Sequence, residues 1–333
     1  MELSVRKLRV ASALAEYLPS AVARPLVSSA SSVFAHRSPS ERLVIERYLR
    51  RIYGLELDGV TPDPNNRSWT LPVDAPITEA QLEEKVEQVF ESFGRYWLDA
   101  LRLPSLSLDE LDRTFTYEGL EHLIVPAQAG QGVIAAIPHL GSWESASRWL
   151  VLTHDISVAA AVEHLEPPEL FEWFLSYRRD QLGLNVIAVG PTAAVELAGA
   201  LSAGSVLCLL SDRDLTGDGI EVEFFGERTT LPGGAALLAL RSGAPLVPVA
   251  VFVQGNNHHA VVLPPLDTQR RGRLRADVQR VTQEMANALE VLICRDPTQW
   301  HVLQPNWPSD FAALGMPLPA WVEAKSEKGR SDA

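Results

Sequence analysis

The sequence predicts an α/β fold in which a mostly parallel central sheet is flanked by helices on both faces and preceded by an N-terminal helical region. The chain has 333 residues, of which 46% are apolar and 21% are charged, as is typical of a folded globular protein. From Val133 onward, short β-rich runs alternate with helical runs, the pattern of strand–helix–strand units. No run approaches the roughly 18 apolar residues of a membrane-spanning helix, so we expect the protein to lie on a membrane without crossing it.

Residues 1–60 are expected to form a basic amphipathic helical region. Its first helix has apolar residues at helical spacing: Leu3, Val10, Leu14, Leu18 and Val22. Breaks are expected near Pro19 and Pro25. Residues 1–54 contain nine basic and four acidic residues, a net charge of +5, and the remainder of the chain carries −18. Such a helix can dock on an anionic membrane surface. The alternative is a helix that packs on its own domain and exposes a basic edge to solvent.

The remaining chain divides into an α/β domain over residues 61–322 and a polar tail over 323–333 that we expect to be disordered. A loop over 62–66 precedes a strongly periodic helix over 82–101. Predicted strands are 133–137, 156–162, 186–189, 206–210, 245–253 and 259–263. Predicted helices are 142–152, 168–182, 193–203, 233–242 and 278–292. Ligands of such parallel sheets bind beyond the carboxyl ends of the strands.

Composition and missing motifs exclude several classes of function. The net charge of −13 argues against nucleic acid as a partner, because phosphate binding needs a basic surface. The two cysteines, Cys208 and Cys294, lack the spacing of a disulfide framework or a metal site, so we expect no metal and a reducing cytoplasmic setting. The sequence contains no P-loop, dinucleotide-binding glycine fingerprint, serine nucleophile elbow or catalytic cysteine context.

His139 and Glu144 form the most informative segment. His139 follows the strand over 133–137 and precedes a helix whose expected N-cap is Ser142, so it lies at the carboxyl end of a strand. Glu144 falls in the first turn of that helix, from which it can fold back toward the ring. A histidine held by a carboxylate is an effective general base near pH 7. The alternative is a histidine that only bonds backbone and a glutamate that only complements the helix dipole.

Two further segments belong to the same end of the predicted sheet. Asp212, Arg213 and Asp214 follow the strand over 206–210, which brings a carboxylate and a cation to the edge where His139 is expected. A plain solvated loop is the alternative. Pro232, Gly233 and Gly234 open a helix whose free backbone N–H groups can bind an oxyanion or a phosphate, or can simply begin a helix.

Several blocks of residues resemble the lysophospholipid acyltransferase superfamily related to the lipid A lauroyl- and myristoyltransferases. The sequence is most similar to the actinobacterial phosphatidylinositol mannoside acyltransferases. The blocks are Arg95-Tyr-Trp97, Arg102-Leu-Pro104, His139-Leu-Gly-Ser-Trp-Glu144, Glu163, Tyr177-Arg178, Asp212-Arg-Asp-Leu215, Phe224-Phe-Gly-Glu227, and Pro232 with Gly234. Together they span most of the chain and are far more specific than a histidine and an acid four residues apart.

The resemblance implies transfer of an acyl group from acyl-CoA, or from acyl carrier protein, to a hydroxyl of a membrane lipid. It maps the family's histidine to His139, the acid of its motif to Glu144, and a second carboxylate that completes a charge relay to Asp212. It places Glu163 and Arg178 near the polar head of the acceptor. Asp212 stands where a glutamate is usual, so its shorter side chain falls about one C–C bond short of the ring unless the backbone compensates.

Three further departures concern the acceptor region and leave its identity as a mannoside open. Glu144 replaces a frequent aspartate, His164 replaces the arginine expected after Glu163, and Ala235 replaces a proline.

Our hypothesis is that His139 removes a proton from the acceptor hydroxyl, which attacks the thioester directly, with Asp212 or Glu144 orienting the ring. Arg178 and Arg213 are candidates for binding phosphate of the acceptor or of CoA. No cofactor is expected besides acyl-CoA as co-substrate, and the expected location is peripheral, at the cytoplasmic face of the membrane. Four aromatic residues either line an acyl groove or belong to the core: Trp143, Trp149, Phe224 and Phe225. An acyl-CoA thioesterase, an acyltransferase with another acceptor and a non-catalytic lipid-binding module are the alternatives.

Overall fold

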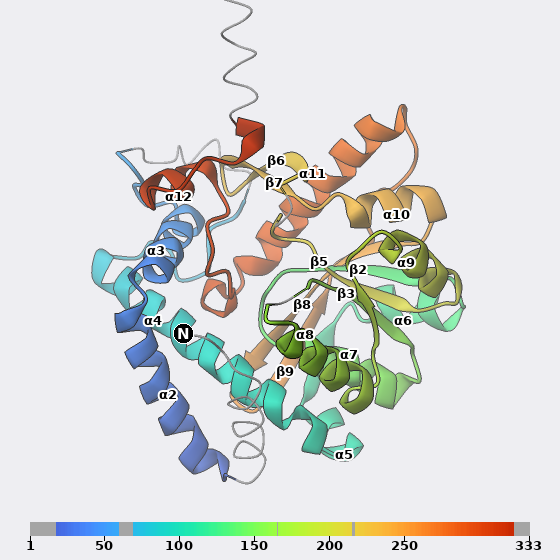
Figure 1. The fold of residues 1–333 in the computed structure, drawn as a ribbon, viewed down its shortest axis with the longest axis horizontal. Helices are drawn as coiled ribbons and strands as arrows, with labels where there is room; N and C mark the ends of the chain where they lie inside the picture. Colours follow the sequence, from blue (N-terminus) through green and yellow to red (C-terminus); the bar gives the residue numbers. More distant parts are fainter. Residues whose placement is uncertain (1–17, 60–68, 165, 215–216, 323–333) are drawn as a thin grey trace, which may run out of the picture.

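The computed structural model describes residues 18–59, 69–164, 166–214 and 217–322 (Figure 1). Seven strands form one sheet in the order β1-β9-β8-β2-β5-β3-β4, and β6 and β7 form a separate hairpin. Every pairing within the large sheet is parallel except that of β8 with β9. The expected α/β fold with a mostly parallel sheet is therefore confirmed.

The bounds of β2 and β5 agree with the strands predicted over 133–137 and 206–210, whereas β1, β6 and β7 lie where no strand was predicted. The strands are β1 Phe115–Glu118, β2 Val133–Ile137, β3 Val158–Val162, β4 Asn185–Ala188, β5 Val206–Leu210, β6 Ile220–Phe224, β7 Glu227–Leu231, β8 Leu246–Gln254 and β9 Asn257–Val262. The helices are α2 Ser20–Arg37, α3 Pro39–Tyr53, α4 Glu79–Arg102, α5 Leu108–Asp112, α6 Glu121–Gln128, α7 Trp143–His154, α8 Pro168–Ser176, α9 Ala193–Ser202, α10 Gly234–Ser242, α11 Leu274–Ile293 and α12 Pro308–Ala313. A π-helical turn, Tyr177–Gln181, extends α8.

Helices cover both faces of the sheet because its central strands are apolar on both sides. In β2, Ile134 and Ala136 belong to a core shared with α3, α4, α10 and α11, while Val133, Ala135 and Ile137 face a second core with α6 and α7. All five residues are at most 4% exposed. This continuous burial is what parallel strands between two helical layers require.

The N-terminal helices pack against the α/β domain. α2 begins directly after Pro19, but it continues through Pro25, so the predicted break near Pro25 is wrong. The reason is packing along α4, where Ala23 lies in one cluster with Leu98 and Leu101 and sustains the helix despite its proline. Figure 1 shows α2 and α4 side by side. Residues 1–17, the loop over 62–66 and the predicted tail lie outside the described residues.

A buried ion cluster joins α3 to the C-terminal helix α12. Asp310 on α12 is fully buried and accepts hydrogen bonds from Arg47 at 2.7 Å and from Arg51 at 2.8 Å. Arg51 also binds Glu227 on β7 at 2.8 Å. In Figure 1, α3 (blue) lies beside α12 (red), although Arg47 and Asp310 are 263 positions apart. The two ends of the described chain therefore belong to one packed unit.

No helix within the described ranges has both the length and the apolar character needed to cross a membrane.

Candidate active site

Three neighbouring strands deliver the candidate residues to one edge of the sheet. β2, β5 and β3 are adjacent and parallel, and they are followed by His139, Asp212 and Glu163, respectively. Register pairs Ile137 with Leu210, the last residues of β2 and β5. The segments that follow β2 and β5 therefore leave the sheet at the same edge, as the sequence predicted.

His139 and Asp212 form a close pair. Nδ1 of the imidazole lies 2.6 Å from Oδ1 of Asp212, and the backbone N–H of His139 donates to Oδ2 at 2.8 Å. A carboxylate only accepts hydrogen bonds, so Nδ1 carries the ring proton and Nε2 holds the basic lone pair. None of the described residues hydrogen-bonds Nε2, and the His139 side chain is 28% exposed. The ring thus offers its basic nitrogen to an incoming group.

Asp212 is an anion held in the interior. The residue is fully buried, which by itself raises the pKa of its carboxyl. The charge and hydrogen bonds of His139, with a further bond from the indole of Trp300 at 2.7 Å, outweigh burial and lower that pKa below its usual value. The shorter aspartate side chain reaches the ring, because the backbone of His139 itself approaches the carboxylate.

A tight turn between β2 and α7 holds His139 in place. Gly141 has a φ of +61°, and a Cβ there would overlap the carbonyl oxygen of Val251 on β8, so only glycine fits. The N–H of Gly141 donates to Gln299 O at 3.1 Å, and the N–H of His301 donates to His139 O at 2.7 Å. The segment after α11 therefore runs beside the turn and is held to it by these two backbone hydrogen bonds. Ser142 occupies the N-cap position of α7 as predicted, but its hydroxyl bonds Ser145 instead of capping the helix.

Glu144 lies in the first turn of α7, as expected, but contacts other partners than His139. Its Oε1 accepts hydrogen bonds from Tyr96 at 2.9 Å and from Arg178 at 3.1 Å. The residue is 2% exposed, and the Arg178 guanidinium lies 5.2 Å from the Trp143 ring centroid. Burial lowers the pKa of Arg178, but Glu144 and neighbouring tyrosines raise it overall, so the arginine stays charged. Of the two acids that the sequence left open, Asp212 is therefore the one that contacts the imidazole.

Polar atoms at this edge remain without partners. Glu144 Oε2, Arg178 Nε and Arg213 Nε are buried, and none of them has a hydrogen-bond partner within the described ranges. Burial lowers the pKa of Arg213, against the opposing charges of Asp212 and Glu163. Glu163 itself is exposed. Unsatisfied buried polar atoms are unusual in folded proteins and mark places where a polar ligand can bind.

Two other predicted segments, around Gly233 and around Asp214, have contacts that account for their local structure. Gly233 is the N-cap of α10, and a Cβ there would press on Ile220 of β6, so the start of α10 lies against the hairpin at Gly233. That the segment from Pro232 to Gly234 binds an oxyanion or a phosphate stays a prediction. Asp214 accepts from the N–H groups of Gly217 and Gly219, at 3.0 and 2.8 Å, and so shapes its loop.

The four aromatic residues proposed for an acyl groove or the core are largely buried. All four belong to the two cores: Trp149, Phe224 and Phe225 are at most 3% exposed, and Trp143, which lies beside Arg178, is 9% exposed. For all four residues, membership of the core fits the structure.

Several residues around the pair were not predicted. Trp300 and Asn306, from the segment after α11, bind the carboxylate and the backbone oxygen of Asp212. His301 packs against Tyr96, with ring centroids 5.5 Å apart, and hydrogen-bonds Ser92 on α4 at 2.9 Å. Tyr96 belongs to a block that carried the family resemblance, but no periodicity or motif marks the others.

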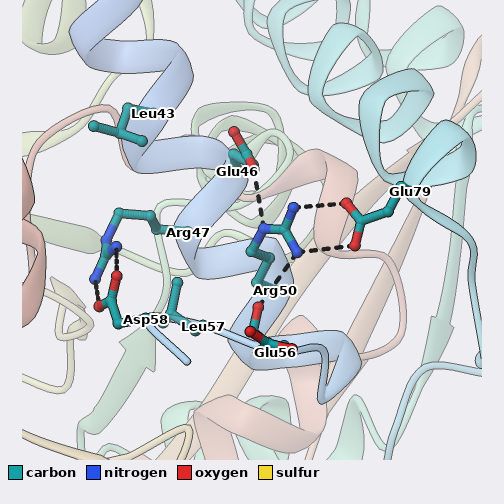
Figure 2. A pocket seen from close by; sticks show the side chains of 8 residues that line it. All are labelled: Leu43, Glu46, Arg47, Arg50, Glu56, Leu57, Asp58 and Glu79. Carbon is teal, nitrogen blue, oxygen red and sulfur yellow. Dashed lines mark hydrogen bonds and ion pairs between the residues drawn. The ribbon is translucent and has the colours of Figure 1, made fainter. Parts of the chain in front are cut away.

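A cavity elsewhere on the surface has different chemistry. Figure 2 shows its lining residues on α3 and around it, including Arg47, Arg50 and Asp58. The guanidinium of Arg47 binds Asp58, and that of Arg50 binds Glu46 and Glu79. Because these cations are already paired, the cavity lacks open donors for an anion. In the described part of the chain, no group of three or more His, Cys, Asp or Glu side chains is arranged to hold a metal ion.

Comparison with known proteins places the chain in an enzyme family. Residues 75–309 match the family described as bacterial lipid A biosynthesis acyltransferase. The phosphatidylinositol mannoside acyltransferase of Mycobacterium tuberculosis strain H37Rv is 38% identical over 227 residues, which are 67% of this chain and 70% of that protein. The enzyme of the same name from Mycolicibacterium smegmatis is 35% identical over 244 residues, 72% of this chain and 76% of its own length. The resemblance read from the sequence is thus confirmed, and the chain belongs to the bacterial lipid A biosynthesis acyltransferase family.

Proposed function

We propose that the protein transfers a long-chain fatty acyl group from acyl-CoA to a hydroxyl of a membrane glycolipid, with a phosphatidylinositol mannoside as acceptor. The observation that carries the proposal is the pair of His139 and Asp212, with Nδ1 held at 2.6 Å and Nε2 left for substrate. The mannoside is supported by the names of relatives that are 35–38% identical over about two thirds of the chain or more. The departures at His164 and Ala235 make the acceptor the first point to test.

The mechanism follows from the protonation of the ring. Nε2 of His139 takes the proton of the acceptor hydroxyl while the hydroxyl oxygen forms a bond to the thioester carbon. The C–S bond then breaks, the CoA thiolate leaves, and the imidazolium returns the proton to the sulfur. Asp212 keeps Nδ1 protonated and stabilises the imidazolium while it exists. No covalent acyl-enzyme forms, and the ring ends in its starting state.

Nearby groups are placed to bind the charged parts of the substrates. The first turn of α7 begins four residues after His139 and has no side-chain cap, so its N–H groups can meet the developing oxyanion. The unpartnered Nε atoms of Arg178 and Arg213 suit phosphate of the acceptor or of CoA. Exposed Glu163 can accept hydrogen bonds from acceptor hydroxyls.

The catalytic proposal is tested with purified protein, palmitoyl-CoA and phosphatidylinositol mannosides, with products identified by mass spectrometry. His139→Ala should abolish acyl transfer. His259→Ala is the matched control, because His259 also pairs with a carboxylate, Glu118 at 3.0 Å, but on the strand β9. Full turnover by His139→Ala would overturn the proposal. CoA release without any acceptor would identify a thioesterase, and transfer only from acyl carrier protein would correct the donor.

We further propose that α2 rests on the anionic cytoplasmic face of the membrane. Val22, Leu26 and Val33 are 48%, 58% and 52% exposed and fall on one face of the helix, at positions i, i+4 and i+11. α2 itself contains Arg24 and Arg37 and no acidic residue, and anionic lipid attracts such a positive charge.

Replacing all three with serine should weaken sedimentation with phosphatidylglycerol vesicles by about 40-fold or more, since burying the exposed half of each Val or Leu contributes about 0.75–1.5 kcal/mol. Activity on detergent-dispersed acceptor should persist. Val125→Ser with Val195→Ser, at 63% and 75% exposed on α6 and α9, is the control. Unchanged sedimentation of the α2 variant would refute the membrane role.

A further inference from the structure

Trp300 lies behind the candidate catalytic pair, in a segment to which the mechanism assigns nothing. Its indole is fully buried, and Nε1 donates to Oδ2 of Asp212 at 2.7 Å. The bond approaches the carboxylate through the oxygen that does not face the imidazole, since the ring of His139 uses Oδ1. Trp300 therefore contacts the relay without reaching the substrate side.

The hydrogen bonds divide unequally between the two carboxylate oxygens. Among the described residues, Oδ2 receives two donors, Trp300 Nε1 and the backbone N–H of His139, whereas Oδ1 receives Nδ1 alone. Rotation of the carboxylate would break both bonds to Oδ2. The arrangement keeps Oδ1 facing Nδ1. Because Oδ1 is an acceptor, Nδ1 carries the proton, and the ring adopts the tautomer that has a basic Nε2.

Trp300 is itself held rigidly. The hydroxyl of Tyr48 on α3 donates to its backbone oxygen at 2.9 Å, and the two rings have centroids 4.8 Å apart. Phe224 and Trp307 pack on the ring at centroid distances of 6.0 and 6.2 Å. Its backbone pairs with Leu140 in the turn after His139. A donor fixed in this way can impose an orientation instead of following one.

We propose that Trp300 is a positioning residue for acyl transfer, which acts through Asp212 on the tautomer and orientation of His139. The inference rests on the proposed function, because it needs His139 to be the base. It predicts that loss of the indole N–H lowers kcat and leaves KM for both substrates nearly unchanged, since Trp300 touches neither substrate.

The test compares three variants. Trp300→Phe removes the N–H and should lower kcat about 10- to 100-fold, the range expected for a hydrogen bond to a charged group. Trp300→His keeps an N–H at the position of the indole nitrogen and should recover most of that kcat, although it fills the core less well and should melt at a lower temperature. Trp69→Phe is the matched control, because Trp69 is buried in the same core but donates to the backbone oxygen of Ile52 at 3.0 Å. It should lower stability and leave kcat near wild type.

A double-mutant cycle separates positioning from general disruption. In an Asp212→Asn background, Trp300→Phe should cost little further kcat if Trp300 acts only through the carboxylate. Additive losses, equal losses in Trp300→Phe and Trp69→Phe, or a kcat of Trp300→His no better than that of Trp300→Phe would overturn the inference. If His139→Ala retains turnover, the proposed function fails. If His139→Ala is inactive while Trp300→Phe is fully active, this inference alone fails.

Discussion

Replacing Asp212 by asparagine should invert the tautomer of His139. The amide has one acceptor oxygen and one donor NH₂ in the space of two carboxylate oxygens. Two N–H groups, from the His139 backbone at 2.8 Å and Trp300 at 2.7 Å, converge on the Oδ2 position and require an acceptor there. The NH₂ must then occupy the Oδ1 position, 2.6 Å from Nδ1. Because two donors cannot face each other, Nδ1 becomes the acceptor and the proton moves to Nε2.

The expected loss follows from this inversion. A protonated Nε2 cannot take the proton of the acceptor hydroxyl, so the contribution of general-base catalysis disappears, on the order of 10²–10⁴ in kcat. KM should change little, because Asp212 is fully buried and does not contact substrate. The protein should stay folded, since asparagine keeps the volume and can form all three hydrogen bonds of the carboxylate, with the bond to Nδ1 reversed in direction.

Initial rates at saturating palmitoyl-CoA and acceptor measure the effect, with the unfolding midpoint measured in parallel. Asp214→Asn is the control for disturbance of the loop, because Asp214 binds Gly217 and Gly219 in the same loop. We expect it to keep near wild-type turnover. A folded Asp212→Asn protein with kcat within about three-fold of wild type would refute this account of the relay, since general-base assistance is worth at least about 10².

Three further outcomes concern stability. Gly141→Ala should destabilise the fold by roughly 2–5 kcal/mol in urea unfolding, because positive φ and overlap with a carbonyl act together; an unchanged midpoint would contradict the turn geometry. Asp310→Asn leaves Arg47 and Arg51 less compensated in the interior and should cost about 3–5 kcal/mol, whereas a loss under about 1 kcal/mol would show that the cluster is not coupled to folding. Burial, with the charge of His139, lowers the pKa of His301 to about 3, while an unfolded histidine titrates near 6.5. The unfolded chain therefore binds the extra proton between these values, and stability should fall on acidification across this window by up to about 1.4 kcal/mol per pH unit; His301→Gln should flatten that slope.

The sequence was sufficient for the central strands of the sheet and for the edge that carries the candidate site, because these depend on local pattern. Continuous apolar runs predicted β2 and β5 with the bounds that the structure has, and their ends located His139 and Asp212. β1 was missed because only one of its four residues is buried, so it carries almost no apolar signal. The hairpin of β6 and β7 was also missed, although apolar and acidic residues alternate in β6.

The details of the site depend on contacts that no local pattern encodes. The sequence placed Glu144 correctly in the first turn of α7. The direction of its side chain, however, is set by the hydrogen bonds from Tyr96 on α4 and from Arg178. Trp300 reaches Asp212 across 88 positions of sequence. Spacing alone could not decide which acid holds the imidazole, because the answer lies in tertiary packing.

The hydrogen bonds that Gln299 and His301 make with the turn of His139 also have a consequence for biosynthesis. Trp300 is synthesised 88 residues after Asp212, and Asp310 is synthesised 263 residues after Arg47. A nascent chain that already carries His139 and Asp212 therefore lacks the parts that hold them in register. Competence to transfer acyl groups should therefore arise only after this late segment has been synthesised and has packed against the turn of His139.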